Sequence, residues 1–164
     1  DMTQVSYYEN GQLKARQNFI KGSRNGLAKS FYENGQLKVS QNDKQGKLDG
    51  LFQAFYKNGQ LKSRQNYIQG NLDGLNETFY ENGQLQNSLS YKDNKRNGLW
   101  SRYFENGQLK TAFEYINNKR EGIYITYEKD GSLAQFRCYE NDELVEPTFC
   151  EEILRDMIDK KENN

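Results

Sequence analysis

The residues that could support acid–base chemistry in this sequence are glutamates that return at a fixed position, Glu9, Glu33, Glu81 and Glu105. Paired carboxylates at a suitable separation can hydrolyse glycosidic bonds. These glutamates, however, return singly, each directly before an Asn-Gly pair, whereas catalytic acids gather in a pocket with shifted pKa values. We therefore interpret them as solvated turn residues.

Histidine is absent from the sequence. It is the commonest general base, the usual partner of a serine or cysteine nucleophile, and a frequent zinc ligand. The glycines follow no pattern of a strand that opens into a helix, so they indicate turns and not phosphate-binding loops. The sequence predicts a protein that is not an enzyme and that uses neither a cofactor nor a metal ion.

Cys138 and Cys150 are the two cysteines of the chain and lie twelve residues apart. Without histidine or a second cysteine pair they do not predict a metal site. In an oxidising compartment, a disulfide between them would tie the C-terminal segment to the last strand. The alternative is two reduced, partly buried thiols, and the sequence favours neither.

The elements that position these residues are repeats with a period of 24 residues. The motif Asn10-Gly11-Gln12-Leu13 returns at 34–37, 58–61, 82–85 and 106–109, and a degenerate copy stands at 130–133. Asn-Gly between aromatic and apolar runs predicts a two-residue type I′ hairpin turn. A second series of glycines, Gly26, Gly50, Gly74, Gly98 and Gly122, predicts a looser second turn. Each repeat is therefore two short strands.

The predicted fold is all-β: an elongated, single-layer array of antiparallel hairpins. Apolar residues make up 34% and the mean hydropathy is −1.10, yet the chain has 12 Tyr, 9 Phe and 1 Trp. Ladders of aromatic residues and leucines are expected to replace a thick core. We place the array at residues 1–139, about six repeats with an incomplete N-terminal half-unit. An upstream half-repeat, further repeats or an export signal is expected to precede it.

Residues 140–164 are predicted to form a C-terminal cap, with a helix at about 149–161. Ile153, Leu154, Met157 and Ile158 would share one stripe of this helix. The helix is expected to cover the last strands, because terminal repeats need a cap. The alternative is a helix that docks onto a partner.

The turn length decides which residues share a face of the sheet. With a two-residue loop, Tyr8 lies opposite Leu13 and shares a face with Trp100, while Lys14 lies on the other face. A three-residue loop with a bulge would exchange these assignments. In the second repeat, Asp43 and Lys44 replace an apolar pair and predict a weak, more exposed or bulged strand end.

A row of aromatic residues is the candidate surface for a protein partner. We expect Trp100, Tyr115, Tyr91, Phe52 and Tyr67 on one face, with Trp100 as the preferred hot spot. The competing interpretation is that Trp100 packs beneath the C-terminal helix.

A basic stripe is the second candidate surface; it comprises Lys14, Lys38, Lys62, Lys110, Arg16 and Arg64. Such a stripe could hold anionic lipid headgroups, acidic glycans or single-stranded nucleic acid. The formal net charge is zero, however, with 23 basic and 23 acidic residues. This balance favours a solvated strand face and gives no reason to expect nucleic acid as a partner.

The unit Tyr-Glu-Asn-Gly-Gln-Leu-Lys, followed by an aromatic residue, Gly, Asp-Gly-Leu and Phe-Tyr, resembles the MORN repeat. The form is the variant common in bacterial proteins that are often described as antitoxin components of toxin–antitoxin systems. The resemblance covers residues 3–139 and implies a twisted antiparallel sheet that acts as a binding scaffold. It implies a protein partner, with membrane phospholipid as the alternative, and a homodimer through a sheet edge or face. Apart from the resemblance, the Tyr- and Asn-rich repeat with its incomplete first unit favours an exported bacterial protein, periplasmic or at the cell surface, over a cytoplasmic one.

Overall fold

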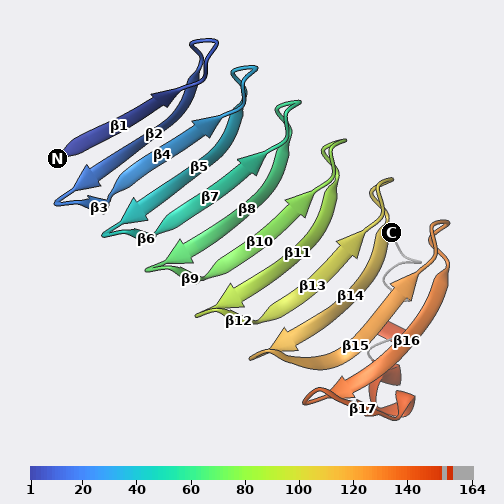
Figure 1. Ribbon diagram of the computed structural model, residues 1–164. Helices are drawn as coiled ribbons and strands as arrows, with labels where there is room; N and C mark the ends of the chain where they lie inside the picture. Colours follow the sequence, from blue (N-terminus) through green and yellow to red (C-terminus); the bar gives the residue numbers. More distant parts are fainter. Residues whose placement is uncertain (153–154, 157–164) are drawn as a thin grey trace.

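The computed structural model describes residues 1–152 and 155–156, and its strands form one antiparallel sheet (Figure 1). The long strands are β1 (Met2–Tyr7), β2 (Leu13–Ile20), β4 (Gly26–Phe31), β5 (Leu37–Lys44), β7 (Gly50–Phe55), β8 (Leu61–Ile68), β10 (Gly74–Phe79), β11 (Leu85–Lys92), β13 (Gly98–Tyr103), β14 (Leu109–Ile116), β15 (Lys119–Tyr127) and β16 (Leu133–Glu140). Shorter segments are β3 (Ser23–Arg24), β6 (Lys47–Leu48), β9 (Asn71–Leu72), β12 (Lys95–Arg96) and β17 (Glu143–Val145). Successive long strands pair side by side as a meander.

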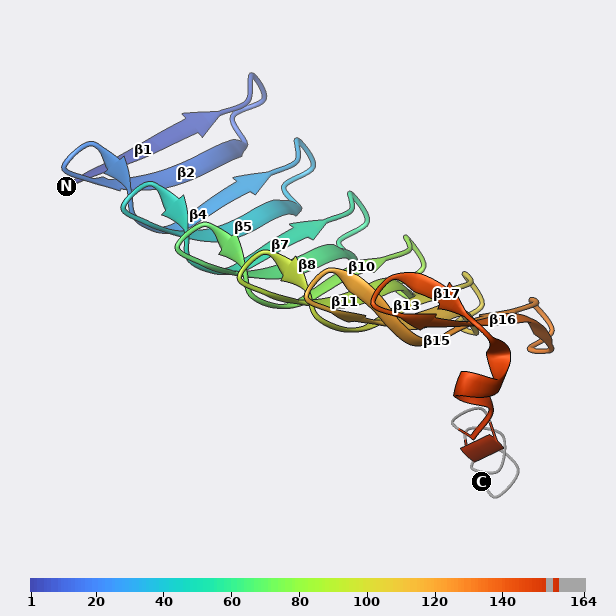
Figure 2. The ribbon, with the colours of Figure 1, turned by 90° about the horizontal axis from the view of Figure 1, so that it is seen from below.

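Among the described residues the sheet is a single layer over most of its length, and its buried side chains are few and scattered (Figure 2). Exposed leucines and isoleucines recur from repeat to repeat instead of meeting in a core. A single layer tolerates this because both faces of an antiparallel hairpin array can meet water. The prediction of an all-β, single-layer hairpin array is confirmed.

The Asn-Gly turns are longer than the predicted two-residue turns. In the first, the Gly11 N–H donates to the Tyr8 carbonyl at 3.0 Å, and the Tyr8 N–H donates to the Gln12 carbonyl at 2.9 Å. Gly11 takes a φ of 82°, whereas the Asn10 side-chain oxygen accepts a hydrogen bond from the Gln12 N–H at 3.0 Å. Asn10 thus serves as an acceptor, and Gly11 alone supplies the positive φ of a bulged loop.

A bulge beside this turn corrects the predicted faces. The pairing passes from Ser6 to Tyr7 with one extra residue, Lys14, on the opposite strand. Lys14 therefore shares a face with Tyr8, and its ammonium lies 5.5 Å from the centre of that ring. Leu13 pairs with Tyr7 on the opposite face. The predicted pairing of Tyr8 with Leu13 is wrong because a bulge places an extra residue in one strand.

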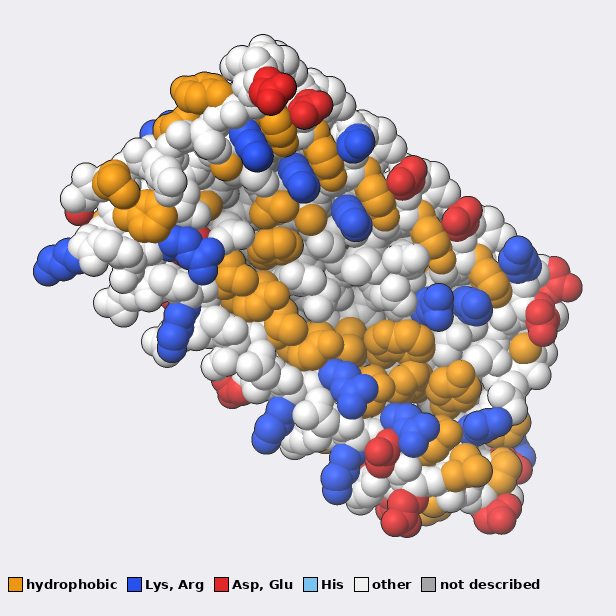
Figure 3. All heavy atoms as spheres, in the orientation of Figure 1, with side chains coloured by type: hydrophobic (Ala, Val, Ile, Leu, Met, Phe, Trp, Pro, Cys, Tyr) orange, Lys and Arg blue, Asp and Glu red, His pale blue; other side chains and the backbone are white. Residues whose placement is uncertain are grey.

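The two faces differ in composition, and we name them accordingly. The aromatic face carries Phe52, Tyr67, Trp100, Phe113, Tyr115 and Tyr124. The leucine face carries Leu13, Leu27, Leu51, Leu75 and Leu99. Figure 3 shows the aromatic face, where a band of hydrophobic side chains crosses the sheet.

Asp43 is buried, and the expectation of an exposed strand end at this position is wrong. It lies within β5, where it pairs with Gly26 and Leu48. One carboxylate oxygen accepts a hydrogen bond from Gln41 Nε2 at 2.8 Å, and the other lies 3.9 Å from Arg24 Nε. The ion pair with Arg24 offsets part of the unfavourable burial of this charge.

After β16 the chain continues as β17, which pairs with β16 in the sheet, and then as a 3-10 helix, η1 (Pro147–Cys150), which packs against β16 (Figure 2). Cys150 forms a disulfide with Cys138, with 5.9 Å between their Cα atoms, and both residues are buried. Residues 151–152 and 155–156 are helical. The predicted stripe of Ile153, Leu154, Met157 and Ile158 lies outside the described residues.

Candidate functional site

Five rings meet on the aromatic face over the last strands of the array. Trp100 and Phe113 lie directly across from each other, with 4.8 Å between ring centres. Phe113 also lies 4.8 Å from Tyr115 and 5.4 Å from Tyr124. Tyr124 in turn meets the Tyr139 ring edge-on at 6.4 Å. We call these five residues the aromatic cluster, and it spans β13 to β16.

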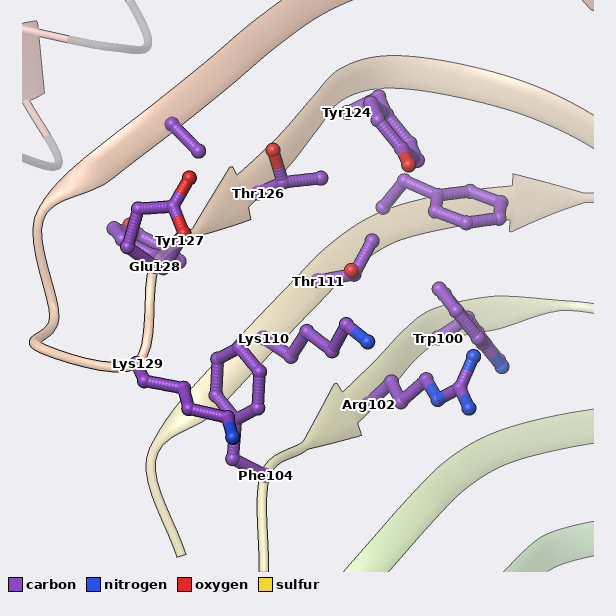
Figure 4. Close-up of a pocket in the computed structure, with 12 residues that line it drawn as sticks. Trp100, Arg102, Phe104, Lys110, Thr111, Tyr124, Thr126, Tyr127, Glu128 and Lys129 are labelled. Carbon is purple, nitrogen blue, oxygen red and sulfur yellow. The ribbon is translucent and has the colours of Figure 1, made fainter. Parts of the chain in front are cut away.

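A groove of about 690 Å³ opens beside the cluster (Figure 4). Trp100, Phe113 and Tyr124 supply its apolar wall, and Thr111 and Thr126 add hydroxyl groups between them. All five side chains come from three neighbouring strands, so the sheet itself fixes their positions. Rigid side chains of this kind lose little conformational entropy when a partner covers them.

The rim of this groove is mainly basic. Arg102, Lys110 and Lys129 line it together with the carboxylate of Glu128. The Lys110 ammonium lies 5.3 Å from the centre of the Phe104 ring. An apolar wall with a basic rim suits an apolar side chain that has a carboxylate nearby.

Two arginines hold the cluster on its other side. The Arg96 guanidinium lies 4.2 Å from the centre of the Tyr115 ring and donates to the Tyr115 hydroxyl at 2.7 Å. Arg120 lies equally close to the Tyr139 ring and donates from Nε to Asp142 at 2.6 Å. This hydrogen bond holds the pKa of the Asp142 carboxyl below its usual value. Tyr115 and Tyr139 are therefore fixed by stacking as well as by the backbone.

The five predicted aromatic residues share the aromatic face but form separate groups. Trp100 and Tyr115 belong to the cluster. Phe52 and Tyr67 form an edge-to-face pair two repeats earlier, with 6.5 Å between ring centres, and burial raises the pKa of Tyr67. Tyr91 lies in β11, between the two groups along the array.

Sequence reasoning missed Phe113, Tyr124 and Tyr139 as site residues. The period of 24 residues could have found two of them, because Tyr124 follows Trp100 and Tyr139 follows Tyr115 at that interval. Phe113 joins the cluster because it pairs across the strands with Trp100. The described part of the C-terminal segment is attached to the leucine face through Cys138, so Trp100 does not pack beneath those residues.

The predicted basic stripe is divided between the two faces. Lys14, Lys38, Lys62 and Lys110 lie over rings on the aromatic face. Arg16 and Arg64 lie on the leucine face, where Arg64 forms an ion pair with the buried Glu77 and lies 5.8 Å from the centre of the Phe79 ring. The cause is again a bulge, which places Lys14 and Lys62 on the face opposite Arg16 and Arg64, two residues later in each strand.

Within residues 1–152 and 155–156, no three His, Cys, Asp or Glu side chains come close enough to hold a metal ion. In the same part of the chain, no helix is long and apolar enough to cross a bilayer. What the aromatic face offers is a surface of rings and cations.

The sequence profile of the MORN repeat variant matches residues 1–21, 24–42, 48–69, 72–93 and 96–117. The matched segments make up more than half of the chain and fall on successive hairpins of the sheet. The chain belongs to the MORN repeat variant family. MORN repeats are, in general, modules that interact with proteins or membranes. No curated protein matches this MORN chain in a sequence comparison.

Proposed function

We propose that this MORN protein is a non-enzymatic scaffold that binds a protein partner through the aromatic cluster. The observation that carries the proposal is the cluster itself, partly exposed beside a groove of about 690 Å³. Tryptophan, tyrosine and arginine are the residues most enriched at the energetic centres of protein interfaces. Trp100, Tyr115, Tyr124 and Arg102 bring these types together on one rigid surface.

The antitoxin role suggested by the bacterial resemblance is the narrower form of this proposal. The partner would then be a toxin, held in a complex of fixed stoichiometry whose formation does not depend on lipid. We further propose that residues 1–139 provide the binding array and residues 140–164 its cap.

Affinity capture from a lysate of the source organism tests the proposal. The intact chain and two double variants serve as baits: Trp100→Ala with Tyr115→Ala, and Phe52→Ala with Tyr67→Ala. The second variant is a matched control, because it removes an aromatic pair from equivalent positions two repeats earlier. A protein retained by the intact chain and by the control, but lost from the cluster variant, would support the proposal. Equal retention by all three baits would contradict it.

The second candidate function is binding to anionic phospholipid. The observation in its favour is the exposed row of Lys14, Lys38 and Lys62 along one edge of the aromatic face. This function requires salt-sensitive sedimentation with phosphatidylserine vesicles. Loss of the aromatic cluster would leave such sedimentation unchanged.

A further inference from the structure

A ladder of lysine–tyrosine pairs runs along the Asn-Gly edge of the aromatic face, apart from the aromatic cluster. Its three consecutive pairs are Lys14 over Tyr8, Lys38 over Tyr32 and Lys62 over Tyr56, with 5.5, 5.6 and 5.6 Å from each ammonium to the ring centre. Figure 3 shows basic side chains that alternate with hydrophobic ones along this edge. The three lysines are exposed and the three rings are half-buried.

The tyrosine rings form a fixed floor that runs across the strands. The Tyr8 hydroxyl donates to the Phe31 carbonyl of the next hairpin at 2.7 Å, and the Tyr32 hydroxyl donates to the Phe55 carbonyl at the same distance. Each ring therefore reaches from its own hairpin toward the next. A ligand that lies on this floor meets rings that are already ordered.

The ladder is locally basic although the chain has no net charge. Among the strands that carry the three lysines, β2, β5 and β8, the acidic residue is Asp43, which is buried. Glu77 of the neighbouring β10 lies on the leucine face. The turn glutamates Glu9, Glu33 and Glu81 stand outside the strands, at the tips of the hairpins. Burial and the nearby Glu81 carboxylate together raise the pKa of Tyr56. The lysine row therefore favours an acidic ligand.

The spacing of the ladder matches one kind of extended peptide. Successive pairs are one hairpin apart, which is two strand spacings or about 9.5 Å. A polyproline II helix rises about 9.3 Å in three residues and docks on aromatic surfaces. A carboxylate at every third residue of such a helix would recur in step with the lysines.

We propose that the ladder binds an extended acidic segment of a partner protein, in polyproline II conformation, with a carboxylate at every third residue. Three carboxylates meet Lys14, Lys38 and Lys62, and the residues between them lie on the tyrosine rings. In the next repeat Gln86 replaces the lysine, so the ladder ends after three pairs. With three residues of the segment for each pair, the bound segment is about nine residues long. The proposal rests on the proposed function in that the partner is a protein, but it concerns a different surface.

A labelled peptide of four Glu-Pro-Pro units, titrated with the full chain and followed by fluorescence anisotropy, tests this proposal. The reference peptide has the same composition with its glutamates in one block. The ladder variant is Lys38→Gln with Lys62→Gln, and the matched control is Lys44→Gln with Lys92→Gln. Lys44 and Lys92 are exposed strand lysines on the leucine face. Circular dichroism establishes that both variants keep the fold.

The proposal predicts that the Glu-Pro-Pro peptide binds better than the block peptide. The ladder variant should weaken its binding about tenfold and the control variant should leave it unchanged. Equal binding of the two peptides, equal loss in both variants, or no binding would overturn the proposal. The proposal would also be overturned if phosphatidylserine vesicles bound the chain through Lys38 and Lys62 while the peptide did not bind. Failure here together with capture of a protein through Trp100 would leave the proposed function intact.

Discussion

At the scale of single residues, the repeated motif joins each hairpin to the next. The Tyr8 hydroxyl donates to the Phe31 carbonyl, and Asn10 Nδ2 donates to the Glu33 carbonyl at 3.3 Å. Tyr32, Tyr56 and Tyr80 repeat the hydroxyl bond one, two and three hairpins later. The most regular residues of the sequence therefore hold the array together, and the residues of the aromatic cluster are those that vary between repeats.

The hydroxyl bond gives the first prediction. Tyr32→Phe removes one hydrogen bond between hairpins and should lower the free energy of unfolding by about 1 kcal/mol. Tyr7→Phe serves as the control, because the Tyr7 side chain is 63% exposed and pairs on the leucine face. Urea denaturation of the two variants measures the difference. Equal stabilities would show that the bond between hairpins contributes nothing.

At the scale of the hairpin, the sequence predicted that the Asn-Gly motif reverses the chain but not how it does so. Two adjacent residues with positive φ are sufficient for a hairpin turn, and Asn and Gly both tolerate that conformation. In the structure the Asn10 side chain caps the Gln12 N–H instead, which lengthens the loop. A bulge beside the turn of each hairpin then decides the face of each lysine in the ladder. A periodic pattern cannot specify this, because one extra residue reverses the faces without changing the 24-residue period.

The turn glycines give the second prediction. Gly59→Ala and Gly11→Ala both place a side chain at positive φ, and each should destabilise the fold by about 1–2 kcal/mol. A Cβ at Gly59 would also lie 3.2 Å from Gln36 Oε1, whereas nothing lies within 4 Å of a Cβ at Gly11. Gly59→Ala should therefore have the lower thermal midpoint. A lower midpoint for Gly11→Ala would show that contact with the preceding hairpin does not matter.

The Arg120–Asp142 pair gives a third prediction, on pH dependence. Because the hydrogen bond from Arg120 lowers the Asp142 pKa from 3.8 in the folded state, its stabilising effect is complete above that value. The effect is lost as the pH falls through the lower, folded-state pKa. Both side chains are partly exposed, so the effect should be small. Asp142→Asn should lower the thermal midpoint at neutral pH. It should also reduce the fall of the midpoint between neutral and acidic pH.

Thermal melts from neutral to acidic pH make this comparison, with Asp93→Asn as the control in the equivalent loop of β11. Asp93 makes no ion pair with an arginine among the described residues. An unchanged acid dependence in Asp142→Asn would contradict the assignment of this bond to the stability of the last hairpins.

At the scale of the whole molecule, the array is one-dimensional: each hairpin contacts its neighbours, and the two faces run the length of the sheet. The 24-residue period therefore predicted the fold, and it placed Trp100 and Tyr115 on one face. It did not predict the cluster, because Phe113 joins Trp100 through a pairing between strands. The 24-residue period also did not predict how the basic residues divide between the two faces, because that division depends on a bulge.

The central claim is that the aromatic cluster binds a protein partner, and the most direct test pairs affinity with stability. The dissociation constant for the captured partner and the thermal midpoint are measured for Trp100→Ala and for Phe52→Ala. Both variants should lower the midpoint by similar amounts, because each loses a ring that packs on a neighbouring strand. Trp100→Ala alone should weaken the partner, by roughly 30-fold or more. A lowered midpoint in Trp100→Ala with unchanged affinity would show that the cluster is packing and not a binding site.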